Sequence, residues 1–280
     1  MVRVNSPWKI SAVGVVALAA AAPIVATLIA AFSAGGPDMA MWSRVGIDYL
    51  TGTIVLCTLV GLGALIIGAG TAMIVTMTEF PGRRFLGVML ALPFAIPAYV
   101  AAYTYADLMA PFGLIASIIG PANLPEIRSL PGAAFILTLM TYPYVYLAVT
   151  ASLAGRSGAL MEAARTLGAS PIHATRQILL GAGRPALVGG LALALMETAA
   201  DYGVADFFGA RTLSVGIFRT WYGLGDLGAA TQLAGGLFLV ALLLVLLEES
   251  SRKGQGVENV RAHRARARLR EILSADGTFF

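Results

Sequence analysis

Two acidic residues, Glu197 and Asp201, lie four positions apart in an otherwise apolar stretch that spans residues 185–205. Residues four apart lie on one face of an α-helix, so we expect the two carboxyl groups to be neighbours. Three further polar residues would extend this surface along the chain, namely Thr198, Tyr202 and Asp206. Such a surface predicts a negatively charged lining that attracts cations. The alternative is a structural network, in which the carboxyl groups accept hydrogen bonds from tyrosine or backbone donors.

Few other residues suit metal binding or nucleophilic catalysis. The sequence has one cysteine, Cys57, and two histidines, His173 and His263, which are far apart. Metal sites usually draw on several such residues at short spacing, so we predict no metal ligands in this chain. Ser170 and His173 suggest a hydrolase pair, but Pro171 lies between them in an arginine-rich segment. We therefore do not expect a hydrolase.

Composition places the chain in a membrane. Of its 280 residues, 58% are hydrophobic and 12% are charged, whereas a soluble domain carries roughly 25% charged residues. The mean hydropathy is +0.81. A soluble fold cannot bury so much apolar surface, and a disordered chain would be far less hydrophobic. The isoelectric point of about 9.4 is attributed to basic loops beside the membrane, so no nucleic-acid partner is expected.

Six apolar stretches are long enough to cross a bilayer, which takes roughly 20 residues as a helix. Five lie near residues 10–32, 52–77, 86–108, 133–152 and 229–247, and the sixth holds Glu197 and Asp201. We predict an all-α integral membrane protein with six transmembrane helices and cytoplasmic N and C termini. With this topology, 15 of the 19 Lys and Arg residues face the cytoplasm, as the positive-inside rule requires. The four on the other side are Arg44, Arg128, Arg211 and Arg219.

Three segments allow two interpretations each. Prolines and glycines interrupt residues 108–125, so we expect a short helix at the outer interface rather than a seventh span. The first apolar stretch, of about 22 residues, is longer than the 7–15 of a signal peptide, so we expect an uncleaved helix. Pro93 and Pro97 each remove a helix hydrogen bond from the third span. They predict either a kink against a neighbour or a broken helix that lines a pathway.

The loop over residues 153–184 is predicted to contain two helices outside the bilayer. Residues 159–167 are strong helix formers, and Gly168 suits the left-handed residue that ends a helix. Ser170 and Pro171 then suit the N-cap and first turn of a second helix, over about 171–180. The first helix carries Glu162 and Arg165 opposite a face of small and apolar residues, namely Ala159, Leu160, Ala163, Ala164 and Leu167. Such a helix suits docking into a groove on another protein.

Six residues in this loop carry a family pattern: Glu162, Ala163, Ala164, Gly168, Ile178 and Leu180. They resemble the EAA loop of ABC-importer permeases, which has Glu-Ala-Ala, three residues, glycine, nine residues and Ile-x-Leu-Pro. The final proline is replaced by Gly181 here. Residues 197–203, 206–209 and 220–223 further resemble the iron(III)-type branch of this family, which has a MetI-like fold. The resemblance extends from about the second span to residue 247.

The resemblance implies a non-catalytic permease subunit of a binding-protein-dependent ABC importer in a bacterial cytoplasmic (inner) membrane. Ferric iron is the implied cargo, with thiamine, polyamines or phosphonates as alternatives. Implied partners are a cytoplasmic ATPase that contacts the six matched residues, a second permease half, an extracytoplasmic substrate-binding protein and the lipid bilayer. No cofactor is implied in this chain, since ATP and Mg²⁺ would bind the ATPase. Accordingly, the sequence has no phosphate-binding loop, and its only lysines are Lys9 and Lys253.

Three regions are predicted: residues 1–51 with the first span, a permease domain over 52–247, and a basic tail over 248–280. The translocation-path candidates are Glu197, Asp201, Pro93 and Pro97, and the loop 206–228 is a candidate docking surface for the binding protein. The tail forms either a basic amphipathic helix on the inner leaflet or a solvated segment. Iron(III)-type permeases often fuse two halves, so the chain is either a dimerising half or a fragment. A proton-driven transporter using Glu197 and Asp201 is the alternative class, and it leaves the EAA loop unexplained.

Overall fold

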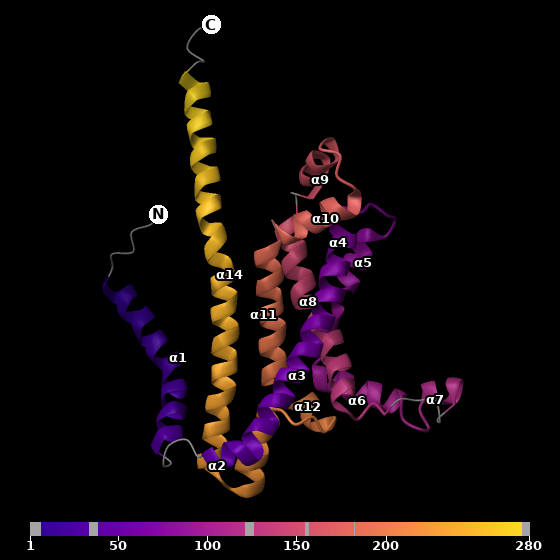
Figure 1. The fold of residues 1–280 in the computed structure, drawn as a ribbon, viewed down its shortest axis with the longest axis vertical. Coiled ribbons are helices and arrows are strands. Elements are labelled where there is room, and N and C mark those ends of the chain that lie inside the picture. Colours follow the sequence, from indigo (N-terminus) through magenta and orange to yellow (C-terminus); the bar gives the residue numbers. More distant parts are fainter. Residues whose placement is uncertain (1–6, 34–38, 121–125, 155–156, 182, 276–280) are drawn as a thin grey trace. The chain divides into compact units, whose positions relative to one another are not determined.

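The computed structural model describes residues 7–33, 39–120, 126–154, 157–181 and 183–275, and every regular element in these ranges is helical. The chain divides into two compact units. The first unit comprises Met1–Gly63, Phe94–Thr141 and Met196–Ala241, and the second comprises Ala64–Pro93, Tyr142–Leu195 and Leu242–Phe280. Four long helices contribute residues to both units (Figure 1): α3 (Ile47–Ala64), α8 (Leu130–Leu153), α11 (Arg184–Ala200) and α14 (Leu227–Ala275).

The first unit is built on α3 and on the first part of α8. Its other elements are α1 (Pro7–Ser33), α2 (Met39–Met41), η1 (Trp42–Gly46), α6 (Ala98–Leu108), α7 (Leu114–Ile119), α12 (Gly203–Phe207), α13 (Leu213–Phe218) and η5 (Arg219–Gly223). Its core consists of apolar side chains from several of these helices, including Leu56, Val60, Ile136, Leu137, Val204 and Phe208. A buried polar contact joins α3 to α13, because the Leu213 N–H donates to the Thr53 hydroxyl at 2.8 Å.

The second unit gathers the helices that position the predicted loop. It contains η2 (Leu65–Ala69), α4 (Gly70–Met77), α5 (Arg83–Met89), α9 (Ser157–Thr166) and α10 (Pro171–Leu180). Its core joins these helices to the end of α8 and includes Ala72, Val75, Tyr146, Val149, Leu153, Ile178 and Leu179. In Figure 1, α9 and α10 lie beside α4, with which both are in contact. The predicted loop is thus built on the core of this unit.

Helix length and composition bear on the predicted spans. Three helices are long and apolar enough to cross a bilayer: Trp42–Met77, Leu130–Leu153 and Leu227–Ser251. Two helix pairs qualify only if each counts as one bent span: Arg83–Ala95 with Ala98–Leu108, and His173–Leu180 with Arg184–Ala200. The described residues therefore confirm a helical membrane architecture with three to five candidate spans. The sixth span and the side on which each terminus lies stay predictions.

The third predicted span is interrupted where its two prolines lie. Helix α5 ends at Met89, a 3₁₀ turn follows (η3, Leu92–Ala95), and α6 begins at Ala98 directly after Pro97. By contrast, α1 and α8 continue through Pro23 and Pro143. Two prolines four residues apart remove successive hydrogen bonds of the same segment, so the helix breaks instead of bending. The broken-helix alternative is confirmed, and a pathway along it stays a prediction.

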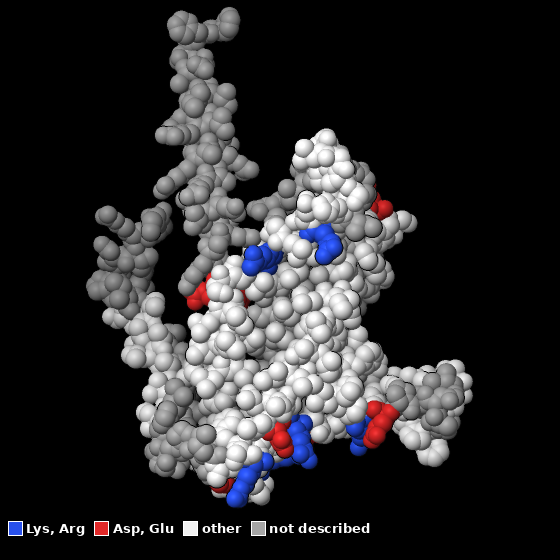
Figure 2. Space-filling model, in the orientation of Figure 1, with Lys and Arg blue, Asp and Glu red and all other residues white. Residues whose placement is uncertain are grey.

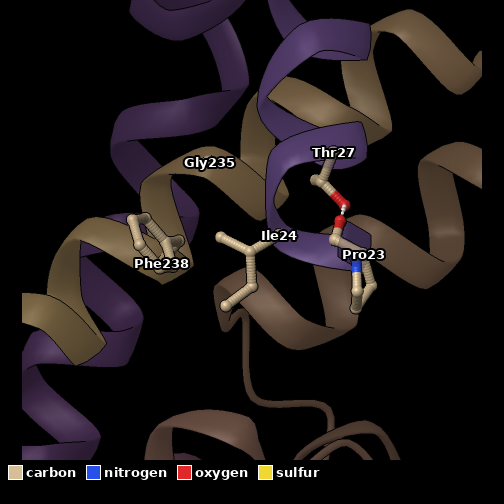
Figure 3. Close-up of a pocket in the computed structure, with 5 residues that line it drawn as sticks. All are labelled: Pro23, Ile24, Thr27, Gly235 and Phe238. Atoms are coloured by element: carbon tan, nitrogen blue, oxygen red, sulfur yellow. Dashed lines mark hydrogen bonds between the residues drawn. The ribbon is translucent and has the colours of Figure 1, made fainter. Parts of the chain in front are cut away.

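Two other segments agree with their predicted helices. Helix α1 runs unbroken over the predicted first span, and α7 is the short helix expected within residues 108–125, of which 121–125 lie outside the described residues. In the first unit, an apolar cavity of about 230 Å³ separates α1 from α14 and is lined by Pro23, Ile24, Thr27, Gly235 and Phe238 (Figure 3). The Thr27 hydroxyl donates to the Pro23 carbonyl at 2.8 Å. None of the predicted site residues lines this cavity.

Candidate functional site

The predicted two-helix loop is confirmed, and its turn has the expected chemistry. Gly168 has φ +77°, the left-handed conformation that glycine adopts at little cost. The Ala169 N–H donates to the Ala164 carbonyl at 3.0 Å, which satisfies one of the last carbonyls of α9. Ser170 then accepts the N–H of His173 at 3.4 Å, with Pro171 in the first turn of α10. Both helix ends are therefore fixed by local hydrogen bonds.

Helix α10 anchors the loop to the second unit through three buried side chains. Ala174, Ile178 and Leu179 are buried, and the latter two belong to the core cluster that includes Leu153 of α8. From α9, Met161 packs against the same cluster. Ile178, one of the six pattern residues, therefore lies in the core and positions the loop.

Helix α9 leaves most of its pattern residues at the surface. Glu162, Ala163 and Gly168 are exposed, Ala164 is half-buried, and Leu167 is 86% exposed. We call Glu162, Ala163, Leu167 and Gly168 the α9 surface. The side chains of residues 157–160 and Arg165 lie outside the described residues. This surface is therefore accessible, as a helix that docks into a groove on another protein must be.

A cavity lies along α10. His173, Arg176, Gln177, Leu180 and Gly181 line a cavity of about 430 Å³. The His173 ring nitrogen Nε2 lies 2.9 Å from Nε2 of Gln177, while Ser170 contacts the backbone of His173. The Ser170 hydroxyl thus serves as a helix cap, and this geometry gives no support to a serine–histidine hydrolase. Leu180, the last pattern residue, is 58% exposed.

The acidic pair lies in the first unit and differs from its predicted arrangement. Helix α11 ends at Ala200, so Asp201 directly follows the helix that holds Glu197 and the two residues do not lie in one continuous helix. One carboxylate oxygen of Asp201 accepts the N–H groups of Val204 at 2.9 Å and Ala205 at 3.2 Å. These bonds satisfy backbone donors at the start of α12, as a capping side chain does. Asp201 therefore fits the structural alternative, whereas Glu197 is exposed.

Substitutions of Asp201 are expected to separate capping from charge. Asp201→Ala removes the acceptor and should lower the free energy of unfolding by about 1–2 kcal/mol, the usual cost of a lost cap. Asp201→Asn keeps an acceptor oxygen and should lose less than half as much. Thermal unfolding of the purified variants measures both values. If Asp201→Asn is stable but transports nothing, the charge itself is needed and the capping explanation is insufficient.

Charged and aromatic side chains surround α12 in the first unit. Asp206 pairs with Arg219 at 3.0 Å, and the Arg128 guanidinium lies 4.8 Å from the centre of the Phe207 ring. Trp221 and Tyr222 stack on each other and are exposed. In Figure 2, charged side chains of this unit gather at the end that holds α12. Among the described residues, no three His, Cys, Asp or Glu side chains are placed to hold a metal ion.

Comparison with known proteins identifies the family. The family model described as binding-protein-dependent transport system inner membrane component matches residues 64–247. The sulfate transport system permease protein CysT of Salmonella typhimurium is 30% identical over 142 residues, which cover 51% of each protein. An Fe(3+)-transport system permease protein of Haemophilus influenzae, FbpB 2, is 25% identical over 201 residues, covering 72% of this chain and 37% of that protein. The chain thus spans about half the length, or less, of these relatives.

Solved structures share the fold at low sequence identity. A chain of a bacterial alginate ABC transporter, solved in complex with an alginate pentasaccharide-bound periplasmic protein, superposes with a TM-score of 0.71 at 17% identity, covering 88% of this chain and 94% of that one. A chain of the MetNI methionine ABC transporter, in an inward-facing conformation, gives 0.58 at 19% identity, with 77% and 96% covered. The helical fold is therefore that of ABC importer permeases. By the family match over most of its length, the chain belongs to the binding-protein-dependent transport system inner membrane components.

Proposed function

We propose that the chain is the membrane-spanning permease subunit of an ATP-driven importer in a bacterial cytoplasmic membrane. It would have six spans and cytoplasmic termini, pair with a second permease half, and receive its cargo from an extracytoplasmic binding protein. A separate ATPase, which binds ATP and Mg²⁺, would bind the α9 surface. The exposed aromatic residues Trp221 and Tyr222 belong to the loop we propose for contact with the binding protein.

The single observation that carries this proposal is the construction of the α9–α10 loop. Glu162, Ala163 and Leu167 are exposed on α9, while Ile178 and Leu179 hold α10 in the core. Because Met161 of α9 packs against the same cluster as Ile178 and Leu179, a force applied to α9 would reach the packed helices through these contacts. A proton-driven transporter has no use for such a surface.

For the cargo we propose a small inorganic ion, with ferric iron and sulfate as the two candidates. The Fe(3+) permease relative aligns over more of this chain, at 72%. The sulfate permease relative is more identical, at 30%. An exposed carboxylate at Glu197 favours a cation on electrostatic grounds. Only the sequence identity to the sulfate permease supports sulfate as the cargo.

Reconstituted uptake tests both levels of this proposal. The chain is co-expressed with a candidate ATPase and a candidate binding protein, and the complex is placed in proteoliposomes. We expect uptake of ⁵⁵Fe(III) or ³⁵S-sulfate that needs both ATP and the ATPase. Uptake driven by a proton gradient with no ATPase present would contradict the importer proposal. Uptake of thiamine, a polyamine or a phosphonate instead would keep the importer and replace its cargo.

A further inference from the structure

The end of α5 in the second unit has backbone carbonyls that its own helix does not fully use. The last carbonyls of a helix lack the N–H groups of a following turn. Here the Ala91 N–H, which would continue an α-helix by donating to Gly87, donates to Val88 at 3.0 Å. Pro93 then supplies no N–H at all. The Gly87 and Leu90 carbonyls are partly buried, so leaving them without a donor costs free energy.

Two tyrosine hydroxyls from α8 supply such donors. The Tyr146 hydroxyl donates to the Gly87 carbonyl, and the Tyr142 hydroxyl donates to the Leu90 carbonyl, each at 2.8 Å. The two tyrosines are four residues apart, so they lie on one face of α8. Both are buried, and Tyr146 is among the largest fully buried side chains of the chain. Two bonds of this kind fix both the position and the rotation of α5 against α8.

The same stretch of α8 is packed against the α9–α10 loop. Tyr142, Tyr146 and Val149 belong to one buried cluster with Leu153 at the end of α8 and with Ile178 and Leu179 of α10. Close-packed interiors transmit displacement, because side chains have no empty space to absorb it. A displacement of α10 therefore reaches the two hydroxyls through contacts inside one unit, and the hydroxyls are bonded to α5.

We propose that Tyr142 and Tyr146 are positioning residues that link movement of the α9–α10 loop to α5, the first part of the broken third span. The proposal rests on the proposed function. It adds the residues through which a conformational change of the ATPase would reach that span. Tyrosine is suited to this role because its ring packs in the core while its hydroxyl bonds a backbone carbonyl, which no purely apolar side chain can do.

The test removes the two hydroxyls and keeps the rings, with the double variant Tyr142→Phe/Tyr146→Phe. Tyr99→Phe, which changes an exposed tyrosine in the same way, is the matched control. The full complex with its ATPase is reconstituted, and ATP hydrolysis is measured alongside uptake of ⁵⁵Fe(III) or ³⁵S-sulfate. We expect the double variant to hydrolyse ATP normally, while the ATP consumed per ion transported rises by roughly tenfold, the scale of two lost hydrogen bonds. The control should keep the original ratio.

Hydrogen–deuterium exchange gives a second readout that needs no cargo. In the unmodified complex, trapping the ATPase with ADP and vanadate should change exchange in residues 157–180 and in residues 83–92. In the double variant we expect the first change to persist and the second to disappear. If both changes persist, or if uptake and hydrolysis fall together with thermal stability, the tyrosines are only structural and the inference is overturned. Should the double variant fail to fold, each single variant is subject to the same criteria. A complex that never recruits an ATPase would instead refute the proposed function.

Discussion

Replacing Glu162 by arginine is expected to abolish ATP-driven uptake while the chain still folds and inserts. Glu162 is exposed on α9, and surface substitutions usually change the free energy of unfolding by no more than about 0.5 kcal/mol. At an interface, a like-charge contact costs several kcal/mol, which corresponds to a loss of affinity of about a hundredfold or more. Binding of the ATPase should therefore fail although the permease is intact. Co-purification of the ATPase and uptake into proteoliposomes measure the effect.

The matched control is Glu79→Arg. Glu79 is also an exposed carboxylate and lies in the second unit, two residues after α4. Its replacement by arginine makes the same change of charge as Glu162→Arg. We expect Glu79→Arg to retain ATPase and uptake, which would assign the effect to the α9 surface and not to net charge. Equal loss in both variants would point to a general electrostatic effect. Full uptake by Glu162→Arg would remove the α9 surface from the mechanism.

The sequence predicted most accurately those features that depend on neighbouring residues. The bounds of α10, the left-handed Gly168 and the Ser170 cap all follow from turn and capping chemistry within a few positions. The break at Pro93 and Pro97 follows equally from local loss of backbone donors. The positions of the long helices were predicted from charge-free stretches. This also uses only neighbouring residues, because every helix that crosses a bilayer needs a similar length and an apolar composition.

Features that depend on distant residues were not predicted. The bonds from Tyr142 and Tyr146 join residues 52 and 59 positions apart, and no local pattern pairs a tyrosine with a particular carbonyl. The end of α11 at Ala200 was missed because residues 185–205 are apolar apart from Glu197 and Asp201. The sequence also does not distinguish Asp201 as the cap of α12 from a residue of a continuing helix. Met161 was not recognised as the anchor of α9, since which face of a short helix is buried depends on where α10 and α4 lie.

The π-helical turns were missed for a related reason. Trp42–Gly46, Leu65–Ala69 and Arg219–Gly223 each insert a wider turn into otherwise regular helical stretches. Such turns are rare and often occur at functional positions. At η2, Gly68 lies against the backbone of α8, where an added Cβ would be 2.7 Å from the Tyr142 carbonyl oxygen. The glycines of the second span are typical of close helix packing, but they do not identify the partner helix. The structure shows that η2 packs closely against the backbone of α8.

Two adjacent glycines of α11 are expected to respond oppositely to the same substitution. A Cβ at Gly190 would lie 2.8 Å from both the Tyr144 carbonyl oxygen and the Val145 Cα, and backbone atoms of a packed helix cannot move aside cheaply. Gly190→Ala should therefore lower the free energy of unfolding by about 1–3 kcal/mol, as overpacking does. A Cβ at Gly189 meets only the end of the Glu248 side chain, at 3.6 Å. Gly189→Ala should stabilise α11 by about 0.5–1 kcal/mol through helix propensity.

Thermal unfolding of the two purified variants in the same detergent tests both expectations. Each variant serves as the control for the other, because both replace glycine by alanine at neighbouring positions of α11. The expected order of midpoints is Gly189→Ala above the unmodified chain and Gly190→Ala below it. Since Gly190 contacts α8 beside Tyr146, its substitution should also disturb α5, so peptides from residues 83–92 should exchange faster in Gly190→Ala alone. Identical midpoints for the two variants would mean that α11 and α8 are not in close backbone contact, and that α8 is held by its side chains only.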